Sequence, residues 1–537
     1  MNLVYMSEKQ PRGHMGKVEQ VKKFPRSLPE ECTPVVGIHF KTFFNKYSKL
    51  GKGETLSRIY EFFFRLFENW YGVRLYIELP DTLKDIHPDI WDLGHMISAL
   101  KKEDILSHVE MLPNRHDEPM LYRYHSVLPN LPGPFHSLNG VGHSFFSEKE
   151  ALLTSIGEAV ERNCYRHFFP DDSITIKSTY RELKDNAINP LRITGISDEI
   201  RKKSSDIRLR PIIEDTNLTW VQGFSLVYGY STWIPLQLVT VNPIIQQGFV
   251  SGKETIIRQS VSTGAAVGQG KSDALYRGIC EVIERDAFMI TYLNCIAPPK
   301  IKLSDLTDER LSFIKRQFEK HNLEAFVLRL PTDFPVHSIM VYLRDKKKQS
   351  PYFSLGFKTD LDLDTACYGA MKEALNARIA NRFTLERVDS LDSDPMQRKE
   401  YEQSELYTRV HQWLTNPDWV SQIEFLIGGE EVEVSSLPQF SAATGSFEDK
   451  LSFLTSFLEK ENIEAVYVEN TTKNLKKACH IGSFSLRSYF VVIPSLQSMH
   501  LSEDFACNSG VRLKSVPEKL GYTVDADFIN PLPHPVV

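Results

Sequence analysis

The residues best suited to chemistry occur in a short phrase that the chain carries twice. Residues 157–163 read GEAVERN and residues 280–286 read CEVIERD, so each copy has Glu-x-x-Glu-Arg inside an apolar helical pattern, at an offset of 281 − 158 = 123 residues. Buried carboxylates are costly unless something pairs with them, and carboxylates bind Mg²⁺, which in turn binds phosphates. The phrase therefore predicts a site for cations and a polyanion, formed by Glu158, Glu161, Arg162, Glu281, Glu284 and Arg285.

The same residues have a simpler interpretation as the solvated faces of two amphipathic helices. Acid–base pairs at i and i+4 stabilise such a face modestly. Solvation does not require the same order of residues twice, however, so the recurrence favours a functional site. Further polar residues share these faces: Ser155 in the first helix, and Asp273 and Arg277 in the second.

Local signals mark where these helices begin. Ser147 and Glu150 fit a capping box ahead of the first helix. The second helix follows a Ser/Gly-rich loop, STGAAVGQG at 262–270, whose backbone N–H groups could bind phosphate at a helix N-terminus. This loop includes Thr263 and is not a Walker A sequence, because no Gly-Lys-Ser/Thr follows. A third predicted helix, over 364–383, partly repeats the phrase with Glu373, Asn376 and Arg378.

Runs of apolar and β-branched residues between the helices predict strands. A Gly turn is predicted at 140–142, a linker or edge strand in the Pro-rich segment 119–140, and irregular structure over 390–445. The predicted strands are 218–227, 231–242, 324–330, 337–343, 351–359, 464–469 and 488–494. The sequence thus predicts an α+β fold with a pseudo-repeated core of mixed sheets and helices.

The predicted domain organisation places a small appendage ahead of this core. Residues 1–30 are polar and predict a disordered leader. Residues 31–118 include an aromatic helical pattern and predict a mostly helical appendage. The main domain is expected over 119–530, and a Pro-rich tail over 531–537.

Composition excludes several classes of protein. The formal net charge of the 537 residues is 63 − 69 = −6, so no global basic field favours nucleic acid. The seven cysteines are scattered without a CxxC pair, which disfavours structural zinc and indicates a reducing cytoplasm. No apolar run approaches the roughly 20 residues that span a bilayer, so we expect no membrane segment.

These motifs resemble the YcaO-domain family. SIGEAVER (155–162) is similar to the family's Ser-x-x-Glu-x-x-Glu-Arg, and STGAAVG (262–268) to its Ser-Asn-Gly-x-Ala-Ala-Gly. CEVIERDAF (280–288) and KEALNAR (372–378) are similar to its second and third helices. The tail adds the Pro-x-Pro-x-Pro ending of azoline-forming members, with Pro531, Pro533 and Pro535.

The resemblance implies a YcaO-type core and an ATP- and Mg²⁺-dependent cyclodehydratase of thiazole/oxazole-modified peptide biosynthesis. Such enzymes convert Cys, Ser or Thr of a ribosomal precursor peptide to thiazoline or (methyl)oxazoline through phosphorylation of the amide oxygen. The implied Mg²⁺ ligands are Glu158, Glu161, Glu281 and Glu284, and the implied nucleotide-binding residues are Ser155, Arg162, Thr263, Asp273, Arg277 and Arg285. The tail would act at the site, and the Val537 carboxylate would assist proton transfer.

The resemblance also implies partners. A separate leader-binding protein of the E1-like, ocin-ThiF type is expected, because the first 115 residues are too few for a fused one. A flavin-dependent azoline dehydrogenase and a homodimer are further expectations from the family.

Departures from the family pattern leave two alternatives open. The family's Gly-Lys-Gly has Val141 in place of Lys, the loop Asn is Thr263, and the second helix has Asp273 and Arg277 where Glu and Gln are usual. The chain could therefore be a non-catalytic scaffold subunit of a peptide-modification complex. It could also be a YcaO enzyme that makes a thioamide or amidine.

Overall fold

A computed structural model of the chain describes residues 4–6, 35–37, 74–76, 88–129, 139–390, 405–525 and 528–536. The chain divides into two compact units, Met1–Arg162 with Asn474–Phe484, and Asn163–Lys473 with Ser485–Val537. Most of the predicted leader, the aromatic pattern expected to be helical, and Val537 lie outside the described residues. The domain boundaries drawn from the sequence stay predictions.

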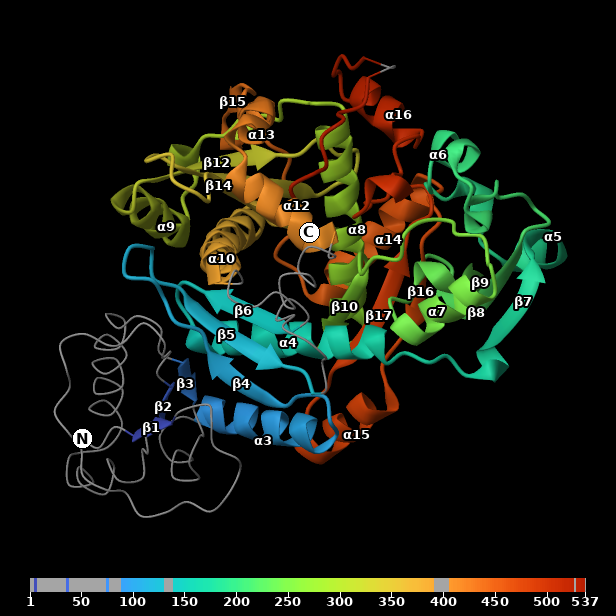
Figure 1. Ribbon diagram of the computed structural model, residues 1–537, viewed down its shortest axis with the longest axis horizontal. Helices are drawn as coiled ribbons and strands as arrows, with labels where there is room; N and C mark the ends of the chain where they lie inside the picture. Colours follow the sequence, from blue (N-terminus) through green and yellow to red (C-terminus); the bar gives the residue numbers. More distant parts are fainter. Residues whose placement is uncertain are drawn as a thin grey trace. The chain divides into compact units, whose positions relative to one another are not determined.

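The first unit contains one six-stranded sheet in the order β1-β2-β3-β4-β5-β6 (Figure 1). Its strands are β1 (Val4–Met6), β2 (Val35–Gly37), β3 (Arg74–Tyr76), β4 (His108–Met111), β5 (Tyr122–Val127) and β6 (Gly140–Ser144). The helices described in this unit are α3 (Pro88–Lys102), most of α15 (Lys473–Gly482), and α4 (Glu148–Arg166) as far as Arg162.

Two predictions about this region were wrong. The Pro-rich segment supplies β5, which is not an edge strand because it pairs with both β4 and β6. Pro119 and Pro129 flank β5 and leave its N–H groups free for the ladder. The predicted Gly turn at 140–142 is part of β6, and its glycines serve a close approach to α4: a Cβ at Gly142 would lie 1.8 Å from the Ala151 carbonyl oxygen.

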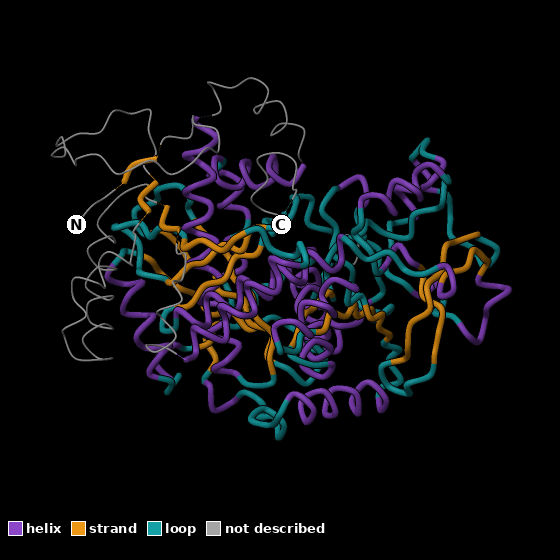
Figure 2. The backbone as a smooth tube through the Cα atoms, turned by 90° about the horizontal axis from the view of Figure 1, so that it is seen from below, coloured by secondary structure: helices purple, strands orange, loops and turns teal. Residues whose placement is uncertain are grey.

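The second unit combines helices with strands, and the strands form two sheets (Figure 2). One sheet has the order β10-β17-β16-β8-β7, with β9 paired to β8, and the other has the order β14-β13-β12-β11-β15. The first comprises β7 (Thr175–Thr179), β8 (Asn217–Ser225), β9 (Ser231–Pro235), β10 (Ala265–Gly268), β16 (Val466–Glu469) and β17 (Arg487–Val492). The second comprises β11 (Lys300–Ile301), β12 (Leu323–Arg329), β13 (His337–Asp345), β14 (Phe353–Asp360) and β15 (Glu431–Val432).

The core of this unit is organised around one long helix, α8 (Lys271–Leu293), which contacts β10 and β17 of one sheet and β13 and β14 of the other (Figure 1). Buried apolar side chains on more than one side of α8, among them Ile279, Ile283, Phe288 and Tyr292, explain why it lies between two sheets. The other α-helices that the structure describes in this unit are α5 (Tyr180–Leu183), α6 (Asp198–Lys203), α7 (Pro243–Ser251), α9 (Glu309–Lys320), α10 (Leu363–Ser390), α12 (Glu405–Thr415), α13 (Pro417–Gln422), α14 (Phe447–Lys460) and α16 (Arg512–Lys519).

The region 390–445 differs from the prediction of irregular structure. It holds α12 and α13, separated by Asn416, whose side chain caps α13 ahead of Pro417 at the first helical turn. Asn followed by Pro is a strong helix start. Trp413 and Leu414 give α12 a buried face. None of the described helices is long and apolar enough to cross a membrane.

Candidate active site

Each of the three glutamate-bearing helices follows an edge strand and returns a carboxylate to it. β6, β10 and β14 each lie at an edge of their sheets and precede α4, α8 and α10. The donors are the N–H groups of Val141 in β6, Gly264 directly before β10 and Phe357 in β14. They bond the Oε2 atoms of Glu158 at 2.6 Å, Glu281 at 3.1 Å and Glu373 at 2.6 Å, respectively. An outward N–H at a sheet edge has no ladder partner, and a carboxylate is a strong acceptor for it. The repeated phrase thus corresponds to a repeated strand–helix unit in which a glutamate of the helix accepts a hydrogen bond from the sheet edge.

The loop before α8 requires glycine at one position. Gly264 has φ +94°, and a Cβ there would lie 2.1 Å from the Val491 carbonyl oxygen. The residues after it, Ala265–Gly268, form β10 rather than a loop. Thr263, the predicted nucleotide contact, is half-buried directly before this glycine. The backbone N–H of Gly264 is already bonded to Glu281 and is therefore not free for a phosphate.

In the first unit, the residues of α4 engage one another and the strands of their own sheet. Arg162 Nη2 donates to Glu158 Oε1 at 2.5 Å across one helical turn. Ser155 is buried, with its Oγ 2.8 Å from Ser126 Oγ of β5 and donating to the Leu152 carbonyl. Glu161 is half-buried, one turn from Glu158. Ser147 caps α4 by accepting from the Glu150 N–H, while Glu150 accepts from Ser144 Oγ.

In the second unit, three carboxylates from α8 and α10 gather around one arginine. Burial raises the pKa of Glu281 to about 7, against the opposing charge of Arg285 and the Gly264 N–H. Burial and, to a smaller extent, repulsion from Glu284 together raise the pKa of Glu373 to about 7. The pKa of Glu284 is raised by burial as well, although Arg285 opposes this. Burial is the largest cause of all three shifts, and the charges of Arg285 and Lys358 oppose it only in part.

Arg285 is incompletely satisfied. Its guanidinium lies 5.7 Å from the centre of the Phe357 ring, and its buried Nη1 has no hydrogen-bond partner among the residues that the structure describes. A buried donor without a partner is costly. An anion such as a phosphate would satisfy Nη1, and a divalent cation would relieve the repulsion among the carboxylates. Glu281, Glu284, Glu373 and Arg285 therefore fit a metal–phosphate ligand, although within the described ranges no three His, Cys, Asp or Glu residues already form a metal site.

The polar face at the start of α8 is closed by its own contacts. Asp273 accepts from the Gln269 N–H at 3.0 Å and from Arg277 Nε at 2.5 Å. The Arg277 guanidinium is half-exposed and lies 5.4 Å from the centre of the Phe447 ring at the start of α14. The nucleotide roles of Asp273 and Arg277 stay predictions.

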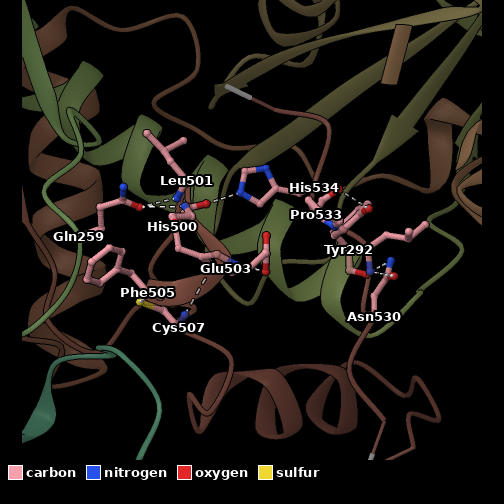
Figure 3. A network of polar contacts seen from close by, with 12 residues as sticks. Gln259, Tyr292, His500, Leu501, Glu503, Phe505, Cys507, Asn530, Pro533 and His534 are labelled. Carbon is pink, nitrogen blue, oxygen red and sulfur yellow. Dashed lines mark hydrogen bonds and ion pairs between the residues drawn. The ribbon is translucent and has the colours of Figure 1, made fainter. Parts of the chain in front are cut away.

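The Pro-rich tail is seated on the C-terminal half of α8 (Figure 3). The Asn530 N–H donates to the Leu293 carbonyl at 2.8 Å, and Asn530 Nδ2 donates to the Tyr292 carbonyl at 3.2 Å. Tyr292 Oη and Trp413 Nε1 donate to the Pro533 carbonyl at 3.1 and 3.2 Å. His534 is 1% exposed. Pro531 is exposed, whereas Pro533 and Pro535 are both half-buried. Pro533 is anchored by the two hydrogen bonds to its carbonyl.

Sequence reasoning missed the role of one residue of the carboxylate cluster, Glu373. The sequence shows Glu373 only as part of the partial repeat in the third helix, whereas in the structure it completes the carboxylate cluster. Arg378 of the same partial repeat does not take the place of Arg285: it is buried and bonds Asp345 at 2.7 Å and the Pro351 carbonyl at 3.0 Å. The signal that separates the two is spacing, since Arg285 follows its glutamate by four residues and Arg378 follows Glu373 by five.

Comparison with known proteins gives one family match, to the family described as YcaO cyclodehydratase, ATP- and Mg²⁺-binding, over residues 142–497. The matched domain is therefore an ATP- and Mg²⁺-binding domain. An uncharacterized protein of Methanothermobacter thermautotrophicus is 24% identical over 263 residues, which are 48% of this chain and 63% of that protein. The chain thus spans less than two thirds of that relative.

Two solved structures share the fold. One is described as a heterocyclase in complex with substrate and cofactor, with a TM-score of 0.61 at 18% identity, covering 82% of this chain and 57% of that one. The other is YcaO from Methanopyrus kandleri bound with AMPPCP and Mg²⁺, with a TM-score of 0.53 at 15% identity, covering 77% and 92%. At such identities the likeness shows the fold alone.

Proposed function

Because the chain belongs to the YcaO cyclodehydratase family, we propose that it is an ATP-dependent enzyme that forms azolines in a ribosomal precursor peptide. The side-chain thiol or hydroxyl of Cys, Ser or Thr attacks the preceding amide carbon and gives up its proton. The observation that carries the proposal is the buried cluster of Glu281, Glu284 and Glu373 around Arg285, inside the matched domain.

The chain's own residues would bind and orient the nucleotide. Bound ATP with Mg²⁺ would supply a phosphoryl group that turns the amide oxygen into a leaving group. Glu281, Glu284 and Glu373 would hold the cations. Arg285 would direct Nη1, which lacks a protein partner within the described part of the chain, to a phosphate oxygen. Glu158, Glu161 and Arg162 keep their predicted roles in metal and nucleotide binding as part of this proposal.

The seated tail supports azoline formation over the other reactions of the family. Its contacts with Tyr292, Trp413 and Leu293 fix its path along α8. A fixed tail can place its end group reproducibly, and the proposal gives the Val537 carboxylate a part in accepting the proton. We propose a separate leader-binding protein as partner, an azoline dehydrogenase acting afterwards, a homodimer and a cytoplasmic location.

The test is heterocyclisation in a defined mixture. The purified chain, a leader-binding partner protein, the precursor peptide and Mg-ATP are combined, and the peptide mass is followed. Loss of one water per ring, dependent on ATP, supports the proposal. Glu281→Gln and Glu373→Gln should slow ring formation at least a hundredfold, while the exposed Glu459→Gln on α14 should not. Ring formation at the full rate in both site variants contradicts the proposed role of the cluster.

Deleting residues 531–537 tests the tail. We expect heterocyclisation to fall at least tenfold, because the deletion removes Pro533 and His534 and with them the contacts that hold the tail on α8. An unchanged rate would remove the tail from the proposal. If the peptide instead gains sulfur in place of oxygen, the chain is a thioamide-forming enzyme.

One observation favours the scaffold alternative. Asp273 and Arg277, at positions assigned to nucleotide binding, satisfy one another instead. Calorimetric titration with Mg-ATP separates the two functions, because a scaffold that has lost the chemistry need not bind the nucleotide. Absent binding, with the partner protein present, would support the scaffold.

A further inference from the structure

The tail residue His534 is enclosed by groups from three parts of the second unit. Its ring lies edge-on to Phe288 and Tyr292 of α8, with centroid distances of 5.9 and 6.3 Å. From α12, Arg409 Nη1 lies 3.2 Å from His534 Nε2. From the segment before Glu503, the His500 ring lies 5.5 Å away and the His500 carbonyl oxygen lies 2.5 Å from the same Nε2 (Figure 3).

These contacts fix the proton on the imidazole. A nitrogen 2.5 Å from a carbonyl oxygen must be the donor, so Nε2 carries the hydrogen and Nδ1 is bare. Arg409 then contributes its charge rather than a hydrogen bond to this nitrogen, and it pairs with Glu503 at 3.0 Å. Burial lowers the pKa of His534 well below its ordinary value, and the charge of Arg409 lowers it further. The ring is therefore neutral and oriented.

A continuous series of contacts runs from His534 to the carboxylate cluster. The ring of Phe288 meets the ring of Phe357 edge-on at 5.1 Å. The Phe357 ring lies under the guanidinium of Arg285, and the Phe357 N–H donates to Glu373. The position of Phe357 thus sets two members of the cluster at once. Phe288, which holds Phe357 from the other side, is itself held by the tail.

We propose that His534 is a positioning residue of the nucleotide site. Its Nε2–H bond to the His500 carbonyl holds the tail against Phe288, and Phe288 and Phe357 in turn hold Arg285 and Glu373 for the metal–phosphate ligand. This inference rests on the proposed function, because it assumes that the cluster binds Mg-ATP. The tail would then contribute to nucleotide binding through His534. This role is separate from the proposed role of the terminal carboxylate in the reaction.

The test compares two replacements of His534 in the full chain. His534→Gln can still present a donor at the Nε2 position, whereas His534→Leu keeps apolar bulk and loses the donor. We expect His534→Leu to raise the KM for ATP on the order of tenfold, with a smaller change in kcat, and His534→Gln to recover most of the affinity. His480→Gln, on the exposed surface of α15, is the control. Equal ATP affinity in wild type and both variants would overturn the proposal.

Hydrogen exchange supplies a readout that needs no nucleotide. In His534→Leu, exchange should accelerate both in 528–536 and in 353–360, where the Phe357 N–H bonds Glu373. His534→Gln should restore both segments. Faster exchange in the tail alone would reduce His534 to an anchor of the tail and overturn its positioning role. If wild type makes no azoline while the exchange and ATP results hold, the proposed function fails and the positioning role stands.

Discussion

The raised pKa values of the carboxylate cluster predict that nucleotide affinity depends steeply on pH. Glu281 and Glu373 both have a pKa of about 7 in the folded protein, and a metal ion binds only their ionised forms. Between pH 6 and pH 8, the ionised fraction of a group with a pKa of about 7 rises from about 0.1 to about 0.9, which is about tenfold. Two such groups change the affinity for Mg-ATP by about 100-fold, or about 2.7 kcal/mol.

The sign of the effect on stability is opposite for the free protein. A carboxyl group whose pKa is raised by folding stabilises the fold fully below its unfolded pKa, and this contribution is lost as pH rises through the folded pKa. The free protein should therefore become less stable between about pH 4.5 and about pH 7 through Glu281 and Glu373. Mg-ATP should offset this loss, and its stabilising effect should grow with pH.

Calorimetric titration with Mg-ATP at saturating Mg²⁺ and at several pH values measures the slope. Glu373→Gln removes one titrating group and should reduce the change between pH 6 and pH 8 to about tenfold. Comparison of the variant with wild type cancels the ionisation of the nucleotide itself. Affinities that agree within about threefold at pH 6 and pH 8, or an unchanged slope in the variant, would refute the reasoning.

Four further substitutions test features of the second unit. Gly264→Ala should destabilise the protein by about 2 kcal/mol or more, because φ is +94° and the added Cβ would collide with the Val491 carbonyl oxygen. Gly248→Ala, inside α7 with open space around it, should stabilise the protein by about 0.5–1 kcal/mol. Thermal melting of the two variants measures both effects. Arg512→Met should cost about 3–5 kcal/mol in urea unfolding, since it leaves the fully buried Asp286 without its ion pair, and a loss below 1 kcal/mol would show that Asp286 is protonated. Arg277→Gln should leave the melting temperature nearly unchanged, because its ion pair is half-exposed, and a tenfold loss of ATP affinity would assign Arg277 to the phosphate.

The elements with strong periodicity could be predicted from the sequence. The helices α4, α8 and α10 and most strands of the second unit lie where apolar spacing placed them. The predicted strand 231–242 stops at Pro235, because proline cannot extend the ladder there. α12 was missed because its polar surroundings hide a short apolar face around Trp413 and Leu414.

The candidate site could be predicted only in part. Spacing identified Glu281, Glu284 and Arg285 because their order repeats along the chain. Glu373 escaped because its role depends on the N–H of Phe357 in an edge strand, and sheet order is not written in local periodicity. The seat of the tail depends on Tyr292, Trp413 and His500, which come from three distant segments, and no sequence spacing relates them.

The hydrogen bonds between the sheet edges and the glutamates give the first glutamate of each phrase a structural role in addition to its proposed role in metal binding. Glu158, Glu281 and Glu373 each shield a backbone N–H that would otherwise face outward from a sheet margin. A related protein that no longer binds nucleotide would still need these three glutamates to satisfy the backbone N–H groups at its sheet edges and to resist aggregation. The presence of these three glutamates is therefore weak evidence that a related protein is active. Glu284 is also bonded to the backbone of Thr359 in β14, so its retention is equally uninformative. Arg285, whose buried Nη1 has no hydrogen-bond partner among the described residues, is the residue whose retention or loss would separate an active relative from an inactive one.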